Sequence, residues 1–138
     1  MTALDPTERA RLAAFAALMI PGGHGMPSAG DIGLADDPAD EVLGIDASRI
    51  DGLKRFLALA GPLATMADIE ALAQRDKAGF ADLGVVLANA YFMHAEVRAA
   101  IGYPGQEARD SSAGLDEHDE AMLAQVVARG PIFRPTPD

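Results

Sequence analysis

The sequence predicts an all-α protein: a compact bundle of five to six helices around a central buried helix at about residues 80–101, with an extended proline-rich C-terminal tail. Two observations lead to this prediction. Apolar residues recur at three- and four-residue steps in several segments, which is the spacing of one helix face. The 138 residues do not show the alternation of apolar and polar residues that is typical of strands, and they contain no internal repeat. We therefore expect one helical domain over 1–129 and a separate tail over 130–138.

The segment 80–101 is expected to form one continuous helix, buried on nearly all sides and ending at Gly102. From Leu83 to Met93 it carries no charge, yet this run is far shorter than the roughly 20 apolar residues of a membrane span. Its one strongly polar side chain is Asn89. Because a buried amide without partners costs about 1–3 kcal/mol, we expect Asn89 to be hydrogen-bonded in the interior.

Cap signatures mark where the earlier helices begin. The residues Asp-Pro-Thr-Glu at 5–8 form a capping-box pattern with proline at the first helical position, and the helix that follows is expected to run to about Ile20. Thr65 with Asp68 three residues later predicts a second such start, and Ser48 is expected to cap another helix.

A last helix is predicted over residues 116–128. Its acidic residues gather at the start, where the helix dipole favours negative charge. Four apolar residues at helical spacing are expected to face the core: Met122, Leu123, Val126 and Val127.

The composition excludes several classes of partner and of chemistry. Lysine and arginine total 11 against 21 aspartates and glutamates, a formal net charge of -10, which repels nucleic acid and anionic lipid surfaces. The absence of cysteine excludes disulfides, thiolate metal sites and cysteine nucleophiles. Arg9 and Arg11 are not adjacent, so there is no twin-arginine signal. The expected location is the cytoplasm, or the periplasm if a leader was removed.

The histidines are weak catalytic candidates. His24 lies in a glycine-rich loop, and we interpret it as a side chain that holds the shape of the loop or touches a partner. His94, on the central helix, is interpreted as a hydrogen-bonded residue at the end of a buried face. Glu117, His118 and Glu120 do not have metal-ligand spacing, because neighbours in a helix point in different directions. No catalytic, cofactor-binding or metal-binding residue is predicted in this chain.

Three segments have the chemistry of recognition surfaces: residues 20–29, 101–106 and 129–135. Each combines stiff proline, permissive glycine and an apolar or aromatic group, and backbone restricted in this way loses little entropy on docking. The partner-interface residues predicted from these segments are His24, Met26, Pro27, Tyr103, Pro104, Gln106, Arg129, Pro131, Ile132, Phe133 and Arg134.

At these same segments the sequence resembles a known family, the gluconate 2-dehydrogenase subunit 3 family, which comprises small subunits of membrane- or periplasm-associated flavin dehydrogenases. Short motifs spread over most of the chain carry the resemblance: Ile20-Pro21, Met26-Pro27-Ser28-Ala29, His94-Ala95-Glu96-Val97-Arg98, Ile101-Gly102-Tyr103-Pro104-Gly105-Gln106 and Arg129-Gly130-Pro131.

The resemblance implies an all-helical, non-catalytic subunit of a heteromeric FAD-dependent sugar or alcohol dehydrogenase or oxidase. The partner it implies is a large oxidoreductase of the glucose-methanol-choline type, which would hold the FAD, while this chain would hold no cofactor and would support the folding, stability or export of the large subunit. Members of the family commonly begin with a twin-arginine signal, and this sequence departs from the family in lacking one.

Two alternatives stay open at this point. The first is a small stand-alone helical isomerase or lyase that uses His24 or His94, which requires a histidine within hydrogen-bond reach of an acid inside a closed pocket. The second is a homo-oligomeric structural protein.

Overall fold

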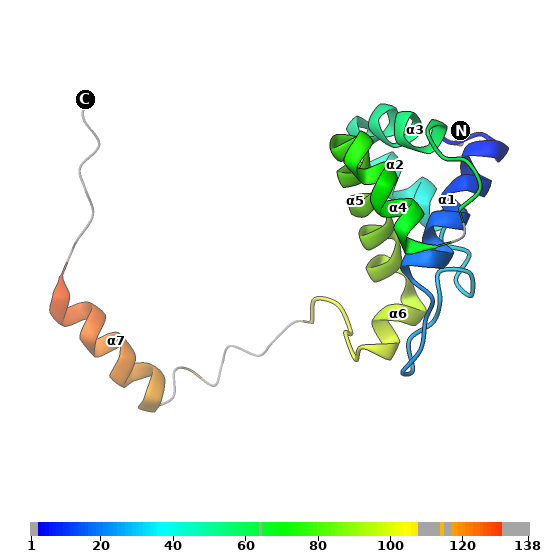
Figure 1. The fold of residues 1–138 in the computed structure, drawn as a ribbon. Coiled ribbons are helices and arrows are strands. Elements are labelled where there is room, and N and C mark those ends of the chain that lie inside the picture. The colour runs from blue at the N-terminus through cyan, green and yellow to red at the C-terminus, as the bar shows by residue number, and fades with distance from the viewer. Residues whose placement is uncertain (1–2, 64, 108–113, 115–116, 131–138) are drawn as a thin grey trace, which may run out of the picture. The chain divides into compact units, whose positions relative to one another are not determined.

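The all-α prediction is confirmed by a computed structural model that describes residues 3–63, 65–107, 114 and 117–130. Within these ranges the chain forms seven α-helices, one short 3-10 helix and no strand (Figure 1). In chain order the elements are α1 (Pro6–Met19), α2 (Asp37–Ile45), η1 (Ala47–Arg49), α3 (Ile50–Ala58), α4 (Met66–Arg75), α5 (Lys77–Met93), α6 (Ala95–Ala100) and α7 (Glu117–Arg129).

The chain divides into two units, residues 1–105 and residues 106–138. This division falls at a different place from the predicted end of the helical domain at residue 129. The first unit contains α1 to α6, and the second contains α7.

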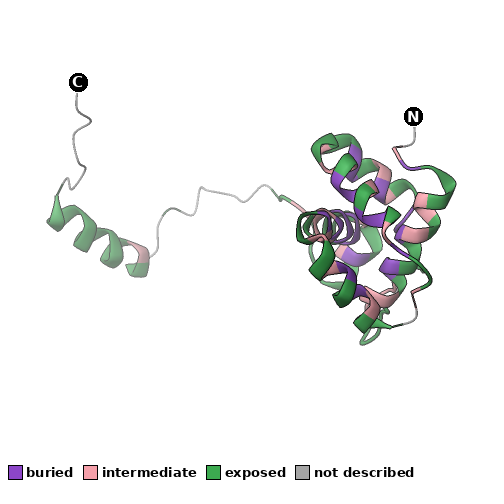
Figure 2. Cartoon of the chain, turned by 45° about the horizontal axis from the view of Figure 1, so that its top comes forward, coloured by how far each residue is buried: buried purple, intermediate pink, exposed green. Residues whose placement is uncertain are grey.

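Helix α5 is the centre of the first unit, as predicted. It packs against α2, α3, α4 and α6, while α1 packs on α3 and α4. Buried residues gather on the inward faces of these helices (Figure 2). Three rings continue the core from α1 to α5: the ring centroids of Phe15 and Phe56 are 5.4 Å apart, and those of Phe56 and Phe80 are 5.8 Å apart. Contacts at this spacing add to the stability that burial provides.

Two of the three predicted helix starts are confirmed in detail. In the capping box of α1, the amide of Glu8 donates to Oδ1 of Asp5 and the amide of Asp5 donates to Oε2 of Glu8, both at 2.8 Å. Thr65 and Asp68 form the capping box of α4. The predicted cap at Ser48 is wrong, because this residue lies inside η1 and its hydroxyl donates to the carboxylate of Asp46 instead.

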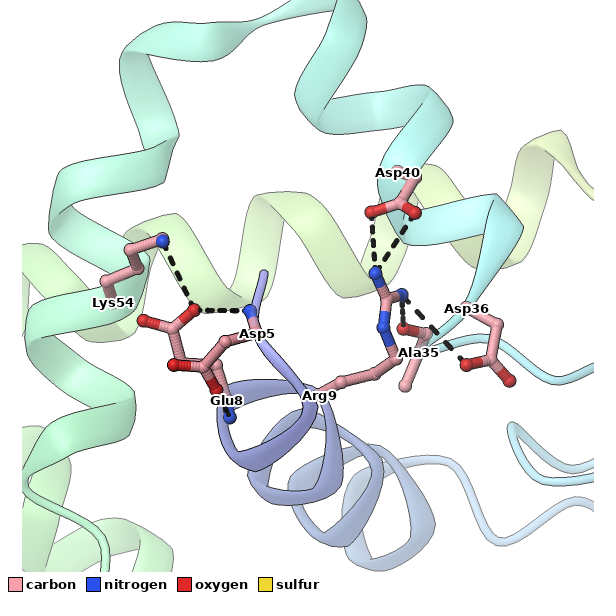
Figure 3. Close-up of polar contacts among 7 residues, drawn as sticks. All are labelled: Asp5, Glu8, Arg9, Ala35, Asp36, Asp40 and Lys54. Atoms are coloured by element: carbon pink, nitrogen blue, oxygen red, sulfur yellow. Dashed lines mark hydrogen bonds and ion pairs between the residues drawn. The ribbon is translucent and has the colours of Figure 1, made fainter. Parts of the chain in front are cut away.

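Polar contacts at the edge of the core orient α1 against its neighbours (Figure 3). Nη2 of Arg9 lies 3.0 Å from both carboxylate oxygens of Asp40 on α2, and Nη1 donates to the carbonyl oxygen of Ala35. On another side of α1, Nζ of Lys54 on α3 lies 3.2 Å from Oε2 of Glu8. These partly buried charges fix the register between elements that apolar packing alone would leave free to slide.

The predicted continuous helix over 80–101 is interrupted in the structure. Helix α5 ends at Met93, and His94 adopts an extended conformation with φ -65° and ψ 136° before α6 begins. The His94 amide donates to the carbonyl oxygen of Tyr91, three residues back, so the last turn of α5 tightens before the chain turns. Neither glycine nor proline marks this break in the sequence.

The predicted helix end at Gly102 is close to the observed one. Helix α6 ends at Ala100, and Gly102 has φ +67°. The amide of Tyr103 donates to the carbonyl oxygen of Arg98 at 2.8 Å, and the amide of Gly102 donates to that of Ala99 at 3.1 Å. These two bonds form a Schellman motif, in which glycine supplies the left-handed conformation.

Helix α5 is not buried on all sides, and the prediction for Asn89 is wrong. The side chain of Asn89 is exposed, as are Phe92 (56%) and Met93 (40%) in the last turn. The helix buries only one broad face: Gly79, Leu83, Val86, Leu87, Ala90 and Tyr91. An apolar helix therefore leaves part of its surface uncovered in this unit.

In the second unit taken by itself, α7 has no buried residue. Met122, Leu123, Val126 and Val127 are all exposed there, so the core that they were predicted to face is not found among the described residues of this unit. Among the described residues, no helix combines the length and apolarity that crossing a bilayer requires.

Candidate functional site

The loop at residues 20–29 forms a short hairpin. The amide of Gly23 donates to the carbonyl oxygen of Met26 at 3.0 Å, and the amide of Met26 donates back at 2.9 Å. The two residues between them, His24 and Gly25, both have positive φ, 53° and 84°. This is the backbone signature of a type I′ turn, which places His24 exposed at the tip.

Several contacts hold this hairpin in place. The hydroxyl of Tyr91 on α5 donates to the carbonyl oxygen of Pro27 at 2.7 Å, and the amide of Ala29 donates to that of Ile20 at 3.0 Å. Ser28 and Asp31 exchange two hydrogen bonds, and the backbone amide of Ser28 keeps the pKa of the Asp31 carboxyl below its ordinary value. The hairpin is thus fixed before any partner arrives.

The turn after α6 lies at the same end of the unit as this hairpin (Figure 1). Ile101 is 49% exposed, Tyr103 is 51% exposed and Pro104 is also exposed. Two of the three predicted recognition segments thus contribute surface near the C-terminal end of α5. Of the third segment, Arg129 is exposed at the end of α7 in the second unit. Gln106 belongs to that unit as well.

The rest of the third segment, Pro131, Ile132, Phe133 and Arg134, lies outside the described residues. The assignment of all these residues to a partner interface stays a prediction.

An apolar groove of about 310 Å³ lies between the end of α1 and α5. Its floor includes Leu87 and Tyr91, which are 2% and 7% exposed. The ring of Phe92 meets that of Tyr91 edge-on, with 5.4 Å between the centroids and 81° between the planes. We call this surface the apolar groove; its lining residues are Met19, Ile20, Gly84, Leu87, Ala88, Tyr91 and Phe92.

A second hollow of about 390 Å³ lies between the start of α2 and the end of α5. We call it the acidic hollow; its lining residues are Ile32, Gly33, Asp36, Asp37, Pro38, Glu41, Ala90, Met93 and His94. Asp36 lies 4.0 Å from Nη1 of Arg9. Within the part of the chain that the structure describes, Asp37 and Glu41 form no ion pair. The hollow therefore combines an apolar wall with unneutralised negative charge.

The two histidines do not form a catalytic pair with an acid among the described residues. The His24 side chain is exposed at the hairpin tip. His94 lines the acidic hollow, and its Nδ1 is buried without a hydrogen-bond partner in the described ranges, so the hydrogen bond predicted for this side chain is not found at that nitrogen. No group of three or more His, Asp or Glu side chains within those ranges is arranged to hold a metal.

Nothing among protein-family models, curated proteins or solved structures matches this chain. The family resemblance of its short motifs stays a prediction for that reason. The hairpin, the apolar groove and the acidic hollow all lie beside α5 and are the candidate functional surfaces of the first unit.

The apolar groove and the acidic hollow are missing from the sequence-based prediction, although one signal for them exists. Asn89 lies three residues before Phe92 and four before Met93, so these residues are neighbours on one side of a helix. A polar side chain at this position marks an outward face. Reading Asn89 as one buried amide hid this pattern.

Proposed function

We propose that this chain is the non-catalytic small subunit of a heteromeric FAD-dependent sugar or alcohol dehydrogenase or oxidase. It binds the large flavoprotein subunit and stabilises it or assists its folding. The observation that carries the proposal is the uncovered apolar surface at the C-terminal end of α5, next to a hairpin that is already held in its final conformation.

The exposed apolar groups at this end of the first unit support binding to another protein. Phe92, Met93, Ile101 and Tyr103 are between 40% and 56% exposed, although each is large enough to stabilise a core. Clusters of this kind are typical of interaction sites. When a partner covers these side chains, their burial contributes hydrophobic free energy to binding that folding of this chain alone does not provide.

The preformed hairpin also supports this role. Its backbone hydrogen bonds between Gly23 and Met26 and its bond to Tyr91 restrict the loop before docking. A restricted loop loses less conformational entropy on binding than a flexible one, so more of the contact energy remains as affinity.

The choice of partner rests on the motifs of the sequence. The Ile20-Pro21 step, the loop that follows it and the turn at 101–106 are among the segments that resemble the small subunits of flavin dehydrogenases. The first two lie in the hairpin, and the third is the exposed turn after α6. In this proposal the FAD and the oxidation of the CH-OH group belong to the large subunit.

Co-expression tests the proposal. A large glucose-methanol-choline-type oxidoreductase is produced with and without this chain, and its solubility, FAD content and dehydrogenase activity are measured. The proposal predicts a stable complex and a higher yield of active, FAD-loaded enzyme when both chains are present. Equal yield and activity without this chain, together with a monomeric small chain of unchanged stability, would overturn the proposal. Turnover of a sugar or alcohol by the purified small chain alone would also do so.

A further inference from the structure

We propose that the apolar groove and the acidic hollow together bind one basic, amphipathic segment of the partner protein. Apolar side chains of that segment enter the groove, and a lysine or arginine reaches the hollow. This inference rests on the proposed function and adds to it the surface used and the chemistry of the segment that is bound.

The groove is open to a partner within the first unit. Phe92 and Met93 are exposed, whereas Leu87 and Tyr91 beneath them are buried and form a firm floor. A floor of buried side chains changes little on binding, so the shape seen here is the shape that a partner meets.

Gly84 lowers the stability of α5 without serving the packing of this unit. It lies in the interior of α5, its φ is not positive, and a Cβ at this position would meet no atom within 4 Å outside its own helix and chain neighbours. Alanine would favour the helix at such a position. Because Gly84 has no side chain and Ala88, one turn later, has only a methyl group, the backbone of another segment can come close to α5 in the groove.

Charge complementarity identifies the segment as basic. Asp36, Asp37 and Glu41 all line the hollow, and among the described residues only Asp36 of these three forms an ion pair, with Arg9 at 4.0 Å. Asp37 lies in the first turn of α2, where it also complements the helix dipole, but Glu41 lies beyond that turn and has no such role. The formal net charge of -10 adds long-range attraction for a cationic segment.

The two sites flank the last turn of α5, where Phe92 lines the apolar groove and Met93 lines the acidic hollow. Adjacent residues of a helix point about 100° apart, so the two sites lie on different sides of α5. A helix that crosses this last turn can place leucine-like side chains against Phe92 and a lysine or arginine beside Met93. The long apolar stem of either basic residue would pack on Met93 while its charged end meets the carboxylates.

The first experiment uses the full chain, labelled with 15N, and two synthetic helical peptides of the same length. One contains leucine and lysine in an amphipathic pattern, and the other has glutamate in place of lysine. The Leu/Lys peptide is expected to shift the amide signals of Gly84, Ala88, Phe92 and Met93, and to bind about tenfold or more tightly than the Leu/Glu peptide. Equal binding of the two peptides, or shifts spread over acidic surfaces elsewhere, would contradict the inference.

Matched variants separate the groove from general hydrophobicity. Phe92→Ser is expected to weaken binding of the Leu/Lys peptide about tenfold, whereas Ile45→Ser, at a residue that is 72% exposed outside both sites, leaves it unchanged. Gly84→Ala is expected to raise Tm and yet weaken binding. Gly44→Ala, at a helical glycine with equally open surroundings, raises Tm and leaves binding unchanged.

A second matched pair separates the hollow from net charge. The double variant Asp37→Asn/Glu41→Gln and the control Asp51→Asn/Glu70→Gln remove the same charge, but only the first changes the hollow. The first is expected to weaken binding of the Leu/Lys peptide several-fold more than the control at about 0.15 M salt, where distant charges are screened. Equal losses would show attraction by net charge alone and would overturn the assignment of the hollow.

The same variants in the complex with the flavoprotein distinguish the two proposals. If the unmodified chain forms no complex, the proposed function fails. If the complex forms, and its affinity is unchanged by Phe92→Ser, Gly84→Ala and Asp37→Asn/Glu41→Gln, the proposed function stands and the segment-binding inference fails. Self-association of the chain that Phe92→Ser abolishes would also overturn the inference, because a second copy would then occupy the groove.

Discussion

The hydroxyl of Tyr91 donates a hydrogen bond of 2.7 Å to the carbonyl oxygen of Pro27, across 64 residues of sequence. This bond joins the hairpin at residues 20–29 to the central helix. The ring of the same tyrosine forms part of the floor of the apolar groove and meets Phe92 edge-on. One side chain therefore keeps the hairpin and the groove in a fixed relation to each other.

Tyr91→Phe is expected to loosen the hairpin while leaving the core intact. The ring stays in place, but the carbonyl oxygen of Pro27 loses its donor, which costs about 0.5–1.5 kcal/mol of stability. Urea unfolding measures this loss, and amide exchange at Gly23 and Met26 should become faster. Tyr103→Phe is the control, since its ring is 51% exposed. Unchanged exchange in the hairpin would show that other contacts suffice to hold it.

His24 is expected to tolerate asparagine and to reject valine. Its φ of +53° lies in the left-handed region, which asparagine adopts readily and a β-branched residue does not. His24→Asn should therefore leave stability unchanged or slightly raised, whereas His24→Val should cost about 1–2 kcal/mol. Thermal unfolding of both variants checks this. A stable His24→Asn variant that binds the flavoprotein less well would show that the imidazole itself contacts the partner.

Local chemistry explains which helix boundaries could be predicted from the sequence. The capping boxes of α1 and α4 depend on residues three apart, Asp5 with Glu8 and Thr65 with Asp68, so the sequence contains all that is needed. The break at His94 has no such local cause, because neither glycine nor proline occurs there. After this break α6 packs on α5 and buries Val97, a tertiary contact that the pattern of one helix does not contain.

The candidate site was less predictable, because it is made by tertiary structure. The acidic hollow lies between the start of α2 and the end of α5. Two of its lining residues, Asp37 and Met93, are far apart in sequence. Periodicity shows which residues of α5 share a face, but it does not show how many neighbours a helix has. The exposure of Asn89 and Phe92 follows from the absence of a described neighbour on that side.

Gly79→Ala is expected to destabilise the first unit, in contrast to Gly84→Ala. Gly79 is buried in the first turn of α5, where a Cβ would lie 2.8 Å from Cβ of Phe56 on α3. The two helices would have to move apart, at a cost of about 1–3 kcal/mol. Gly44→Ala, which meets no neighbour, should instead stabilise by about 0.5–1 kcal/mol. The urea unfolding midpoints of the variants measure these differences in stability. A Gly79→Ala variant as stable as the unmodified chain would contradict the close approach of α3 and α5.

The stability of the first unit is expected to depend on pH through Asp76, the N-cap of α5. Its Oδ2 accepts a hydrogen bond of 2.8 Å from Nε of Arg55, and its Oδ1 accepts one of 2.9 Å from the amide of Gly79. The Arg55 guanidinium first, and then the Gly79 amide, hold the pKa of the Asp76 carboxyl below its ordinary value of 3.8. In the unfolded chain that carboxyl takes up a proton more readily than in the folded one. Its stabilising effect is therefore complete above pH 3.8 and is lost as the pH falls from there through the folded pKa.

Asp76→Asn tests this dependence, because asparagine keeps a side-chain acceptor at the cap and removes the charge. Near neutral pH the variant should unfold at lower urea concentration than the unmodified chain, and the gap between their midpoints should narrow as the pH falls below 3.8. Arg55→Gln should show the same narrowing, since it removes the larger cause of the shift. High salt should reduce the effect of Arg55, whose side chain is 55% exposed, more than that of the Gly79 amide. A gap that stays constant from neutral to acidic pH would show that the charge of Asp76 does not contribute, and that its hydrogen bond to the start of α5 is sufficient.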